Sequence, residues 1–175
     1  ITADENGELY MGTNRSLIKY SPEGNPEIVT PLPADSSTYF NDCFIRALEF
    51  DDNGKLWIGA TEGLFLYDPS SSKVETISVC TENNLSKEIM ALYKDPDGSI
   101  WTGTYSCGLS IIDPGTRSSR KLPLESSYER TNTIRSISRG PLGDYWIGTR
   151  GGMFLYSKMI RITGFFRHDA RDPKS

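Results

Sequence analysis

One phrase recurs four times in this chain, and its most recognisable part is an aromatic-x-Gly triplet. The glycines of the four triplets are separated by 47, 44 and 45 residues, and they are Gly12, Gly59, Gly103 and Gly148. A repeat period of roughly 20–50 residues is typical of solenoids and propellers, in which each unit buries its apolar surface only against its neighbours. The chain therefore folds as an array of similar units.

The phrase is most complete in residues 51–69, which read Asp-x-x-Gly-x-Leu-Trp-Ile-Gly, then Gly-Leu-x-x-Tyr-Asp-Pro. Residues 95–114 repeat it, with one residue inserted before Gly108. The first copy is weaker, because Tyr10 stands in place of tryptophan and Ser16 in place of the second glycine. The fourth copy lacks the leading aspartate but keeps Gly143, Trp146, Gly148, Gly152 and Tyr156. Four copies of one structural unit are predicted.

Each copy contains four short segments with the chemistry of β-strands. An apolar segment rich in β-branched residues precedes Asp-x-x-Gly, a sequence typical of tight turns. These first strands are expected at 45–50, 89–93 and 134–138. The aromatic-x-Gly and Gly-Leu-x-x-Tyr segments predict the second and third strands. Weaker fourth strands are expected at 27–30, 73–79, 120–124 and 159–166.

Four short antiparallel strands in each repeat, without helices, are typical of a β-propeller blade. We therefore predict an all-β fold built from four-stranded antiparallel blades: four blades, or part-blades, of a larger propeller. The predicted units are blades at 1–38, 39–82, 83–127 and 128–166, followed by a tail or link at 167–175. Because Ile1 aligns with Leu48 of the second copy, we expect the chain to be part of a longer polypeptide.

Composition excludes several classes of partner. The net charge is −4 and the pI is about 5.1, which argues against a nucleic-acid-binding surface. No apolar run approaches the length of a membrane span, so we expect no membrane contact by this segment. The three cysteines, Cys43, Cys80 and Cys107, match no zinc pattern and can form at most one bridge. We expect them to be small buried thiols.

The residues do not predict an active site or a metal site. His168 is the only histidine and lies in the tail, which argues against a histidine-based triad and a multi-histidine metal site in the repeats. The Asp-x-Asn-Gly segments resemble calcium loops but lack the distal glutamate, so we interpret them as turns. The recurring tryptophans are expected to pack in the core. No catalytic residue, metal or cofactor is predicted.

Blade geometry indicates where a ligand would bind. The turn between the second and third strands lies at the same end as the connection between blades, and both differ from copy to copy. Aromatic, arginine and asparagine side chains in these segments suit sugars or acidic oligosaccharides. The candidate ligand-binding residues are Arg15, Tyr39, Asn41, Asn84, Tyr105, Tyr128, Arg130 and Arg150.

The phrase in residues 51–69 resembles the two-component regulator propeller repeat, and residues 84–95 resemble the segment that joins its blades. The resemblance extends over nearly the whole chain. In that family the repeats form the periplasmic sensor region of hybrid histidine kinases, known mainly from Bacteroides-type bacteria that degrade polysaccharides.

The resemblance implies an extracytoplasmic sensor region of an inner-membrane protein. Such a region would work with further repeats of the same chain, form a homodimer and bind an oligosaccharide or another small ligand. Binding would be relayed to a kinase outside this segment, which would itself be no enzyme.

Two other functions stay open. One is a propeller enzyme resembling streptogramin lyase, which would need a catalytic base that the repeats here lack. The other is a protein-interaction scaffold like the WD-repeat propellers, for which a broad exposed apolar patch would be expected.

Overall fold

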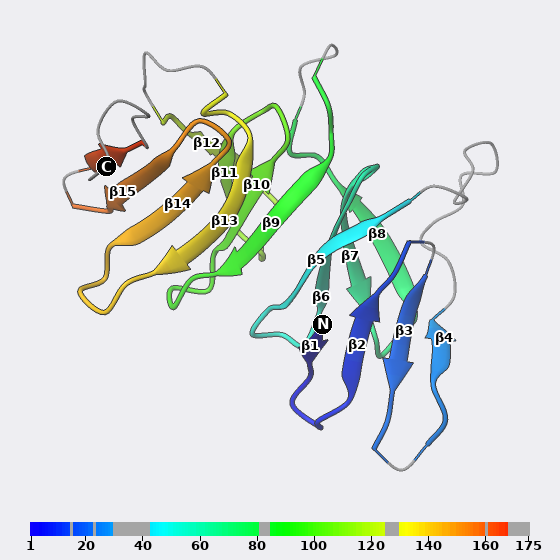
Figure 1. The fold of residues 1–175 in the computed structure, drawn as a ribbon. Helices are drawn as coiled ribbons and strands as arrows, with labels where there is room; N and C mark the ends of the chain where they lie inside the picture. The colour runs from blue at the N-terminus through cyan, green and yellow to red at the C-terminus, as the bar shows by residue number, and fades with distance from the viewer. Residues whose placement is uncertain are drawn as a thin grey trace.

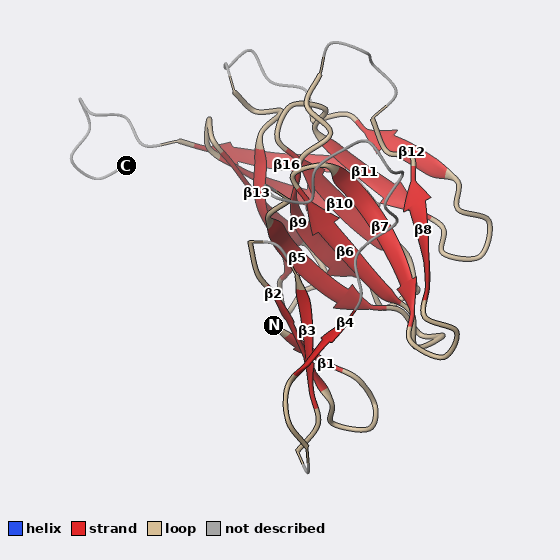
Figure 2. Cartoon of the chain, turned by 90° about the vertical axis from the view of Figure 1, so that its right-hand side faces the viewer, coloured by secondary structure: helices blue, strands red, loops and turns tan. Residues whose placement is uncertain are grey.

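The computed structural model describes residues 1–14, 16–22, 24–29, 43–80, 85–124, 130–159 and 161–167. Sixteen strands in these residues form four separate four-stranded antiparallel sheets, and the strands of each sheet follow chain order. Figure 2 shows strands and loops only, and across the described ranges no helix is long and apolar enough to cross a membrane. The predicted all-β propeller architecture is confirmed.

We number the sheets as blades 1 to 4 in chain order. Blade 1 contains β1 (Thr2–Ala3), β2 (Leu9–Gly12), β3 (Leu17–Tyr20) and β4 (Glu27–Val29). Blade 2 contains β5 (Ile45–Phe50), β6 (Leu56–Ala60), β7 (Gly63–Asp68) and β8 (Lys73–Ile77). Blade 3 contains β9 (Ile89–Lys94), β10 (Ile100–Thr104), β11 (Leu109–Ile112) and β12 (Ser119–Leu122). Blade 4 contains β13 (Ile134–Arg139), β14 (Tyr145–Thr149), β15 (Met153–Ser157) and β16 (Arg161–Phe166).

The first strands of blades 2, 3 and 4 begin at the isoleucine that the repeat predicted. The fourth strands differ from expectation by one or two residues at their ends; β8, for example, ends at Ile77. The predicted blade boundaries fall within 30–42, 81–84 and 125–129, and the predicted tail falls mostly within 168–175. Because these stretches lie outside the described residues, the boundaries stay predictions.

The blades stand side by side with their first strands adjacent. In Figure 1 the strands β5, β9 and β13 lie along one side of the molecule, and β5 contacts β9 while β9 contacts β13. The later strands of each sheet extend away from this side. Each sheet therefore presents one whole face to the next, as the blades of a propeller do.

An isoleucine from each later blade occupies the space directly over the glycine of the preceding triplet. A Cβ atom built on Gly59 would lie 2.6 Å from Cγ2 of Ile89, and one on Gly103 would lie 2.6 Å from Cγ2 of Ile134. Gly12 and Ile45 form the same contact between blades 1 and 2. The triplet thus needs glycine because two blades approach closely there, and any side chain would separate them.

Three apolar clusters fill the interfaces between the blades. Two of the triplet tryptophans, Trp57 and Trp101, are fully buried in them, and the Trp101 ring stacks on Tyr145 with centroids 4.3 Å apart. The expectation that the tryptophans are core residues is confirmed for these two. For Trp146 it stays a prediction, because this residue is half-buried on the face of blade 4 that no described blade covers.

The Asp-x-x-Gly segments are turns held by the aspartate. Oδ1 of Asp51 accepts hydrogen bonds from the backbone N–H of Asn53 (2.9 Å) and Lys55 (3.0 Å), and Oδ2 accepts one from Nε1 of Trp57 (3.0 Å). Gly54, the glycine of this turn, has a φ of 70°, a backbone conformation that glycine adopts more readily than other residues. Both carboxylate oxygens are therefore used within the protein, as the turn interpretation predicts.

In blade 3 the corresponding aspartate binds the next blade. Asp95 is buried and accepts hydrogen bonds from Nζ of Lys158 (2.6 Å) and from the Tyr145 hydroxyl. Burial, together with the hydrogen bond to Asp95, raises the pKa of Tyr145 to about 12. Burial alone would lower the pKa of the Lys158 ammonium, but its hydrogen bonds to Asp95 and Asp97 prevail and raise it above its ordinary value. The ion pair of Asp95 with Lys158 therefore joins blade 3 to blade 4.

The contact of Ile89 with Gly59 predicts a double-mutant cycle. Gly59→Ala should destabilise the protein by about 1–3 kcal/mol through overpacking, and Ile89→Ala by about 2–5 kcal/mol through a cavity. The double variant should lose clearly less than the sum, because the new methyl group occupies part of the space that isoleucine vacates.

Urea unfolding measures all three free energies. Gly24→Ala is the control, since a Cβ there meets its nearest neighbour, Ser21 Cβ, only at 3.7 Å. Strict additivity of the two single changes would show that the residues do not form one contact.

Candidate functional site

The turns between the second and third strands lie beside the segments that enter the first strands. The backbone N–H of Tyr105 donates to the carbonyl of Glu88 (2.9 Å), and that of Arg150 donates to Thr133 (3.0 Å). Thr61 bonds Phe44 in the same way in blade 2 (3.1 Å). The two kinds of segment thus meet at one end of the blades, as predicted. We call residues 43–44, 61–62, 85–88, 105–108, 130–133 and 150–152 the loop end.

A threonine after the triplet glycine fixes the conformation of these turns. Oγ1 of Thr104 donates to the carbonyl of Gly108 (2.9 Å) and accepts from the backbone N–H of Cys107 (2.7 Å). Thr149 makes the same two kinds of hydrogen bond within its own turn, both with Gly152 (2.7 and 3.0 Å). The hydroxyl replaces backbone partners that a short turn lacks. The same threonine therefore holds the turns of blades 3 and 4, whereas blade 2 has Ala60 at this position.

A disulfide joins two blades at the loop end. Cys80, which follows β8, is bonded to Cys107 in the turn between β10 and β11, and their Cα atoms lie 6.0 Å apart. The expectation of three buried thiols is therefore wrong for two of them. It is right for Cys43, which is free and 2% exposed, and whose burial raises the pKa of the thiol.

Further backbone contacts continue from this disulfide into blade 4. The N–H of Gly108 donates to the carbonyl of Asn132 (3.0 Å), and the N–H of Thr133 donates to the carbonyl of Arg130 (3.4 Å). Because Thr133 also accepts from Arg150, the loop segments of blades 2, 3 and 4 form one connected surface. A ligand at this surface would contact several blades at once.

Three of the predicted site residues are described, and all three lie exposed at the loop end. They are Tyr105, with 37% of its surface exposed, Arg130, whose φ is 65°, and Arg150. The other five lie outside the described residues: Arg15, Tyr39, Asn41, Asn84 and Tyr128. Ligand contact by any of the eight stays a prediction.

Two further arginines near this end were not among the site residues predicted from the sequence. Arg46 and Arg135 follow the leading isoleucine of β5 and β13, where the register shifts and a residue is added to the strand. Arg46 pairs with Glu88 (2.8 Å) and lies over the Phe44 ring, 5.8 Å from its centroid. Both arginines follow the leading isoleucine of their repeat, and this shared position is the feature of the sequence from which they could have been predicted.

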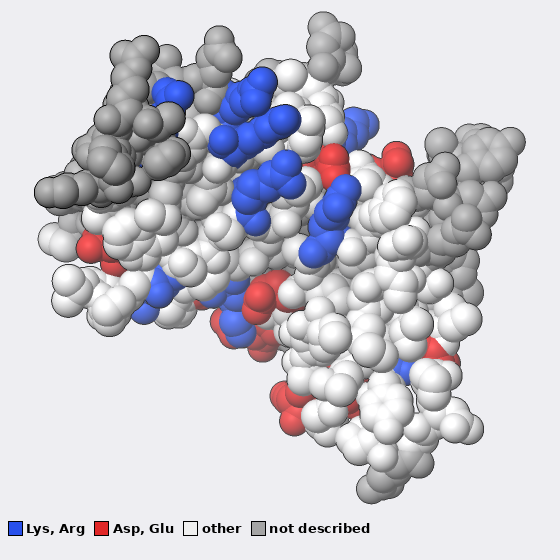
Figure 3. Space-filling view, in the orientation of Figure 1, with Lys and Arg blue, Asp and Glu red and all other residues white. Residues whose placement is uncertain are grey.

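Positive charge gathers on this side of the molecule. Figure 3 shows Lys and Arg side chains in a row over the upper parts of β13, β9 and β5. Among the described residues, Arg130, Arg135 and Arg150 form no ion pair. Exposed guanidinium groups in this arrangement can donate hydrogen bonds to hydroxyl, carboxylate or sulfate oxygens of a ligand.

At the opposite end of the blades, the acidic side chains that line a cavity are already engaged in hydrogen bonds. A cavity of about 450 Å³ there is lined by residues that include Asp97 and Asp113. Asp97 is bound to Lys158 (2.7 Å), and Asp113 accepts from the backbone N–H of Thr116 (2.8 Å). Hydrogen bonds from the backbone and side chain of Thr116 hold the pKa of Asp113 below its usual range. Within the described ranges, no three His, Cys, Asp or Glu side chains gather as a metal site requires.

Comparison with solved structures identifies proteins of the same fold. One is described as the extracellular domain of the hybrid two component system BT4673 from B. thetaiotaomicron, with 26% identity and a TM-score of 0.71. The match covers 87% of this chain and 20% of that one, so this chain spans about a fifth of that domain. The corresponding domain of BT3049 from the same organism has 23% identity and a TM-score of 0.71, covering 97% of this chain and 22% of that one.

A lyase shares the fold at lower identity. Virginiamycin B lyase from Staphylococcus aureus has 14% identity and a TM-score of 0.72, and the match covers 95% of this chain and 54% of that one. No curated protein matches the sequence.

A family model matches two segments of the chain. The model described as "Two component regulator propeller" matches residues 39–62 and 85–106. The identity to the BT4673 domain, 26%, is higher than the identity to the lyase, 14%. Residues 39–62 and 85–106 thus resemble two component regulator propeller repeats, and the chain is similar in fold to the extracellular domains of hybrid two component systems.

Proposed function

We propose that this chain is an extracytoplasmic, ligand-sensing propeller segment of a two-component sensor histidine kinase. It binds an oligosaccharide at the loop end and does no chemistry itself, and the binding is relayed to a kinase outside the segment. The observation that carries the proposal is the joint match to the family model and to the extracellular domain of BT4673.

The disulfide supports a periplasmic location. Disulfides persist in oxidising compartments such as the bacterial periplasm and are rare in the reducing cytosol. The bond between Cys80 and Cys107 is the kind of link that such a compartment maintains. The extracellular domains to which the chain is similar support the same location.

The loop end supports an oligosaccharide as the ligand. Phe44 and Tyr105 are each more than a third exposed there and offer flat apolar faces on which a sugar ring can stack. The guanidinium groups of Arg130 and Arg150 supply hydrogen-bond donors beside them. Alternation of aromatic faces and fixed donors suits a ligand with apolar ring faces and polar edges.

Further propeller repeats of the same chain are the proposed neighbours of this segment. On the uncovered face of blade 4, Trp146 is half-buried, while Met153 and Phe166 are 39% and 49% exposed. At the other end of the array, Ile28 of blade 1 is 68% exposed. Additional blades would cover both faces in the way that blade 3 covers Trp57 of blade 2. We propose in addition that the complete sensor forms a homodimer, through which binding reaches the kinase.

The loop-end proposal predicts the effect of removing two arginines. Arg130→Ala with Arg150→Ala in the intact sensor should raise the oligosaccharide concentration for half-maximal signalling by about tenfold or more, because two hydrogen bonds to the ligand are lost. A transcriptional reporter under control of the system measures this response.

Arg139→Ala is the matched control. Arg139 is exposed on the same blade but pairs with Tyr145 at the far end of β13, so its removal should leave the response unchanged. Equal responses of wild type, the double variant and this control would move the ligand away from the loop end.

The proposed location predicts the state of the cysteines in the isolated protein. Non-reducing peptide mapping of protein extracted from the periplasm should recover a peptide pair joined through Cys80 and Cys107, with Cys43 as a free thiol. Cys80→Ser should lower the free energy of unfolding by about 2–4 kcal/mol, since the disulfide constrains the unfolded chain.

Adding a reductant separates the contribution of the disulfide to stability from the contribution of the packing of the two cysteine side chains. It should destabilise the wild type but leave the variant Cys80→Ser, Cys107→Ser unchanged. Recovery of Cys80 and Cys107 as alkylated thiols from freshly extracted protein would contradict both the bond and the compartment.

A further inference from the structure

Blade 3 departs from the repeat at two positions that face each other across neighbouring strands. In blade 2, Ile58 of β6 pairs with Phe65 of β7, and in blade 4, Ile147 of β14 pairs with Phe154 of β15. The same register position in blade 3 holds Thr102 of β10 and Ser110 of β11. Two large apolar side chains are thus replaced by two hydroxyl groups.

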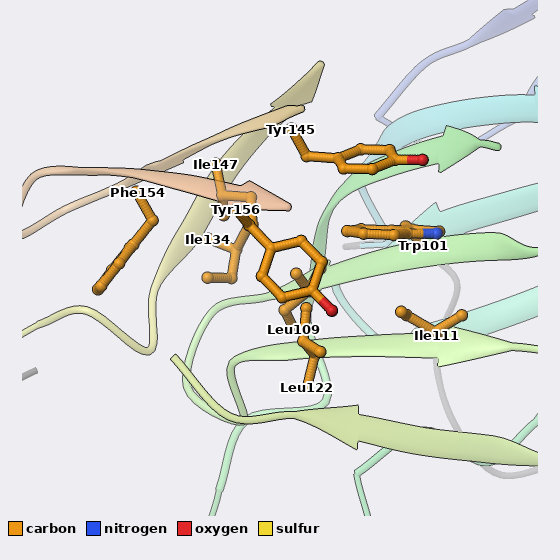
Figure 4. Close-up of a cluster of buried hydrophobic side chains, with 9 residues drawn as sticks. All are labelled: Trp101, Leu109, Ile111, Leu122, Ile134, Tyr145, Ile147, Phe154 and Tyr156. Atoms are coloured by element: carbon orange, nitrogen blue, oxygen red, sulfur yellow. The ribbon is translucent and has the colours of Figure 1, made fainter. Parts of the chain in front are cut away.

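The apolar pairs seal the interface with the preceding blade. Ile58 and Phe65 pack in one cluster with Tyr10 of blade 1. Ile147 and Phe154 pack in another with Trp101 of blade 3, and Figure 4 shows Ile147, Phe154 and Trp101 in that cluster. By the equivalence of the repeats, Thr102 and Ser110 belong to the interface between blades 3 and 2.

A cavity lies where the aromatic side chain is missing. Its volume is about 350 Å³, and both blades line it. Blade 2 and the segment after it contribute Ser78, Val79 and Cys80, and blade 3 contributes Cys107, Ser110, Ser119 and Lys121. This volume lies near the lower limit of small-molecule sites, roughly 300–1,000 Å³, and so suits a single small ring better than a chain of them.

One buried hydroxyl group, that of Ser110, lines this cavity, and a second lies beside it on the neighbouring strand. Ser110 is 3% exposed, and Thr102 beside it is fully buried with no hydrogen-bond partner for its Oγ1 among the described residues. An unpaired buried hydroxyl costs free energy that an isoleucine at the same place avoids. The polar pair therefore weakens packing between blades 2 and 3, which is expected where a position serves a ligand.

From these observations we infer that the cavity between blades 2 and 3 binds one hydroxyl-rich ring, a sugar unit or similar polyol. The serine hydroxyls can both donate and accept, which matches the alternating donors and acceptors of a polyol. Val79 and the disulfide supply an apolar wall for a ring face. The ligand class rests on the proposed function; the site itself rests on the cavity and its hydroxyls.

The cavity is connected with the loop end. Cys107, in its wall, belongs to the turn fixed by Thr104, and Cys80 leads into the segment between blades 2 and 3. The disulfide holds the two sides of the cavity at a fixed separation. Less free energy is therefore spent on ordering the cavity when a ligand binds. A sugar unit held here would sit between two blades, at the edge of the surface proposed for the rest of the oligosaccharide.

The repeat itself supplies the decisive variant. Ser110→Phe places in blade 3 the residue that blades 2 and 4 already carry, and should fill the cavity while the fold is kept. Ser110→Ala keeps the cavity but removes one hydroxyl. Thr76→Phe adds the same ring at an exposed position of β8 and is the control.

Binding of glucose, galactose, mannose, xylose and glycerol to the intact sensor protein is measured by saturation-transfer NMR and calorimetry. At least one probe should bind the wild type and Thr76→Phe equally. Ser110→Phe should weaken that binding at least tenfold, and Ser110→Ala about two- to tenfold through loss of one hydrogen bond. Thermal unfolding checks that Ser110→Phe is folded.

The outcomes separate the cavity from the proposed function. Equal binding by wild type and folded Ser110→Phe, or no binding of any probe, overturns the cavity as a sugar site. If oligosaccharide signalling through the loop end persists in either case, the proposed function stands. Loss of probe binding in Ser110→Phe supports the cavity even if the reporter shows no relay to a kinase.

Discussion

The fold depends on one contact repeated between blades, an isoleucine placed over a glycine. The leading isoleucine of a first strand fills the space that the triplet glycine of the preceding blade leaves open. A single four-stranded sheet cannot bury its two faces, so each blade is stable only when its neighbours make this contact. The aromatic residue beside the glycine then becomes buried in the same interface, as Trp57 and Trp101 are.

This constraint separates scaffold from variable surface. The isoleucine, the glycine and the aspartate of the turn are all engaged in holding or joining blades, which leaves the loop end free to differ between repeats. Blade 3 is the exception, because its scaffold itself changes. Thr102 and Ser110 replace an isoleucine and a phenylalanine, and a cavity lies beside Ser110. Variation inside an interface is more informative than variation in a loop, since an interface position is constrained by packing and a loop position often is not.

The sequence allowed the strands, the turns and the blade array to be predicted because they follow from local chemistry repeated in register. The disulfide was not predictable, since Cys80 and Cys107 occupy unrelated places in their repeats and meet only when blades 2 and 3 pack. Arg46 and Arg135 were missed because a shift in register gives them their place, and strand propensity does not reveal such a shift. Comparison of equivalent positions would have shown the serine at 110, but not the cavity beside it.

Hydrogen–deuterium exchange of the intact sensor, with and without a saccharide that activates it, tests the central claim that the ligand contacts the loop end and the interface of blades 2 and 3. The account predicts slower exchange in residues 104–112 and 130–135 on binding, with residues 51–55 and 95–99 of the opposite turns unchanged. Protection confined to those turns, or protection outside this segment alone, would contradict it.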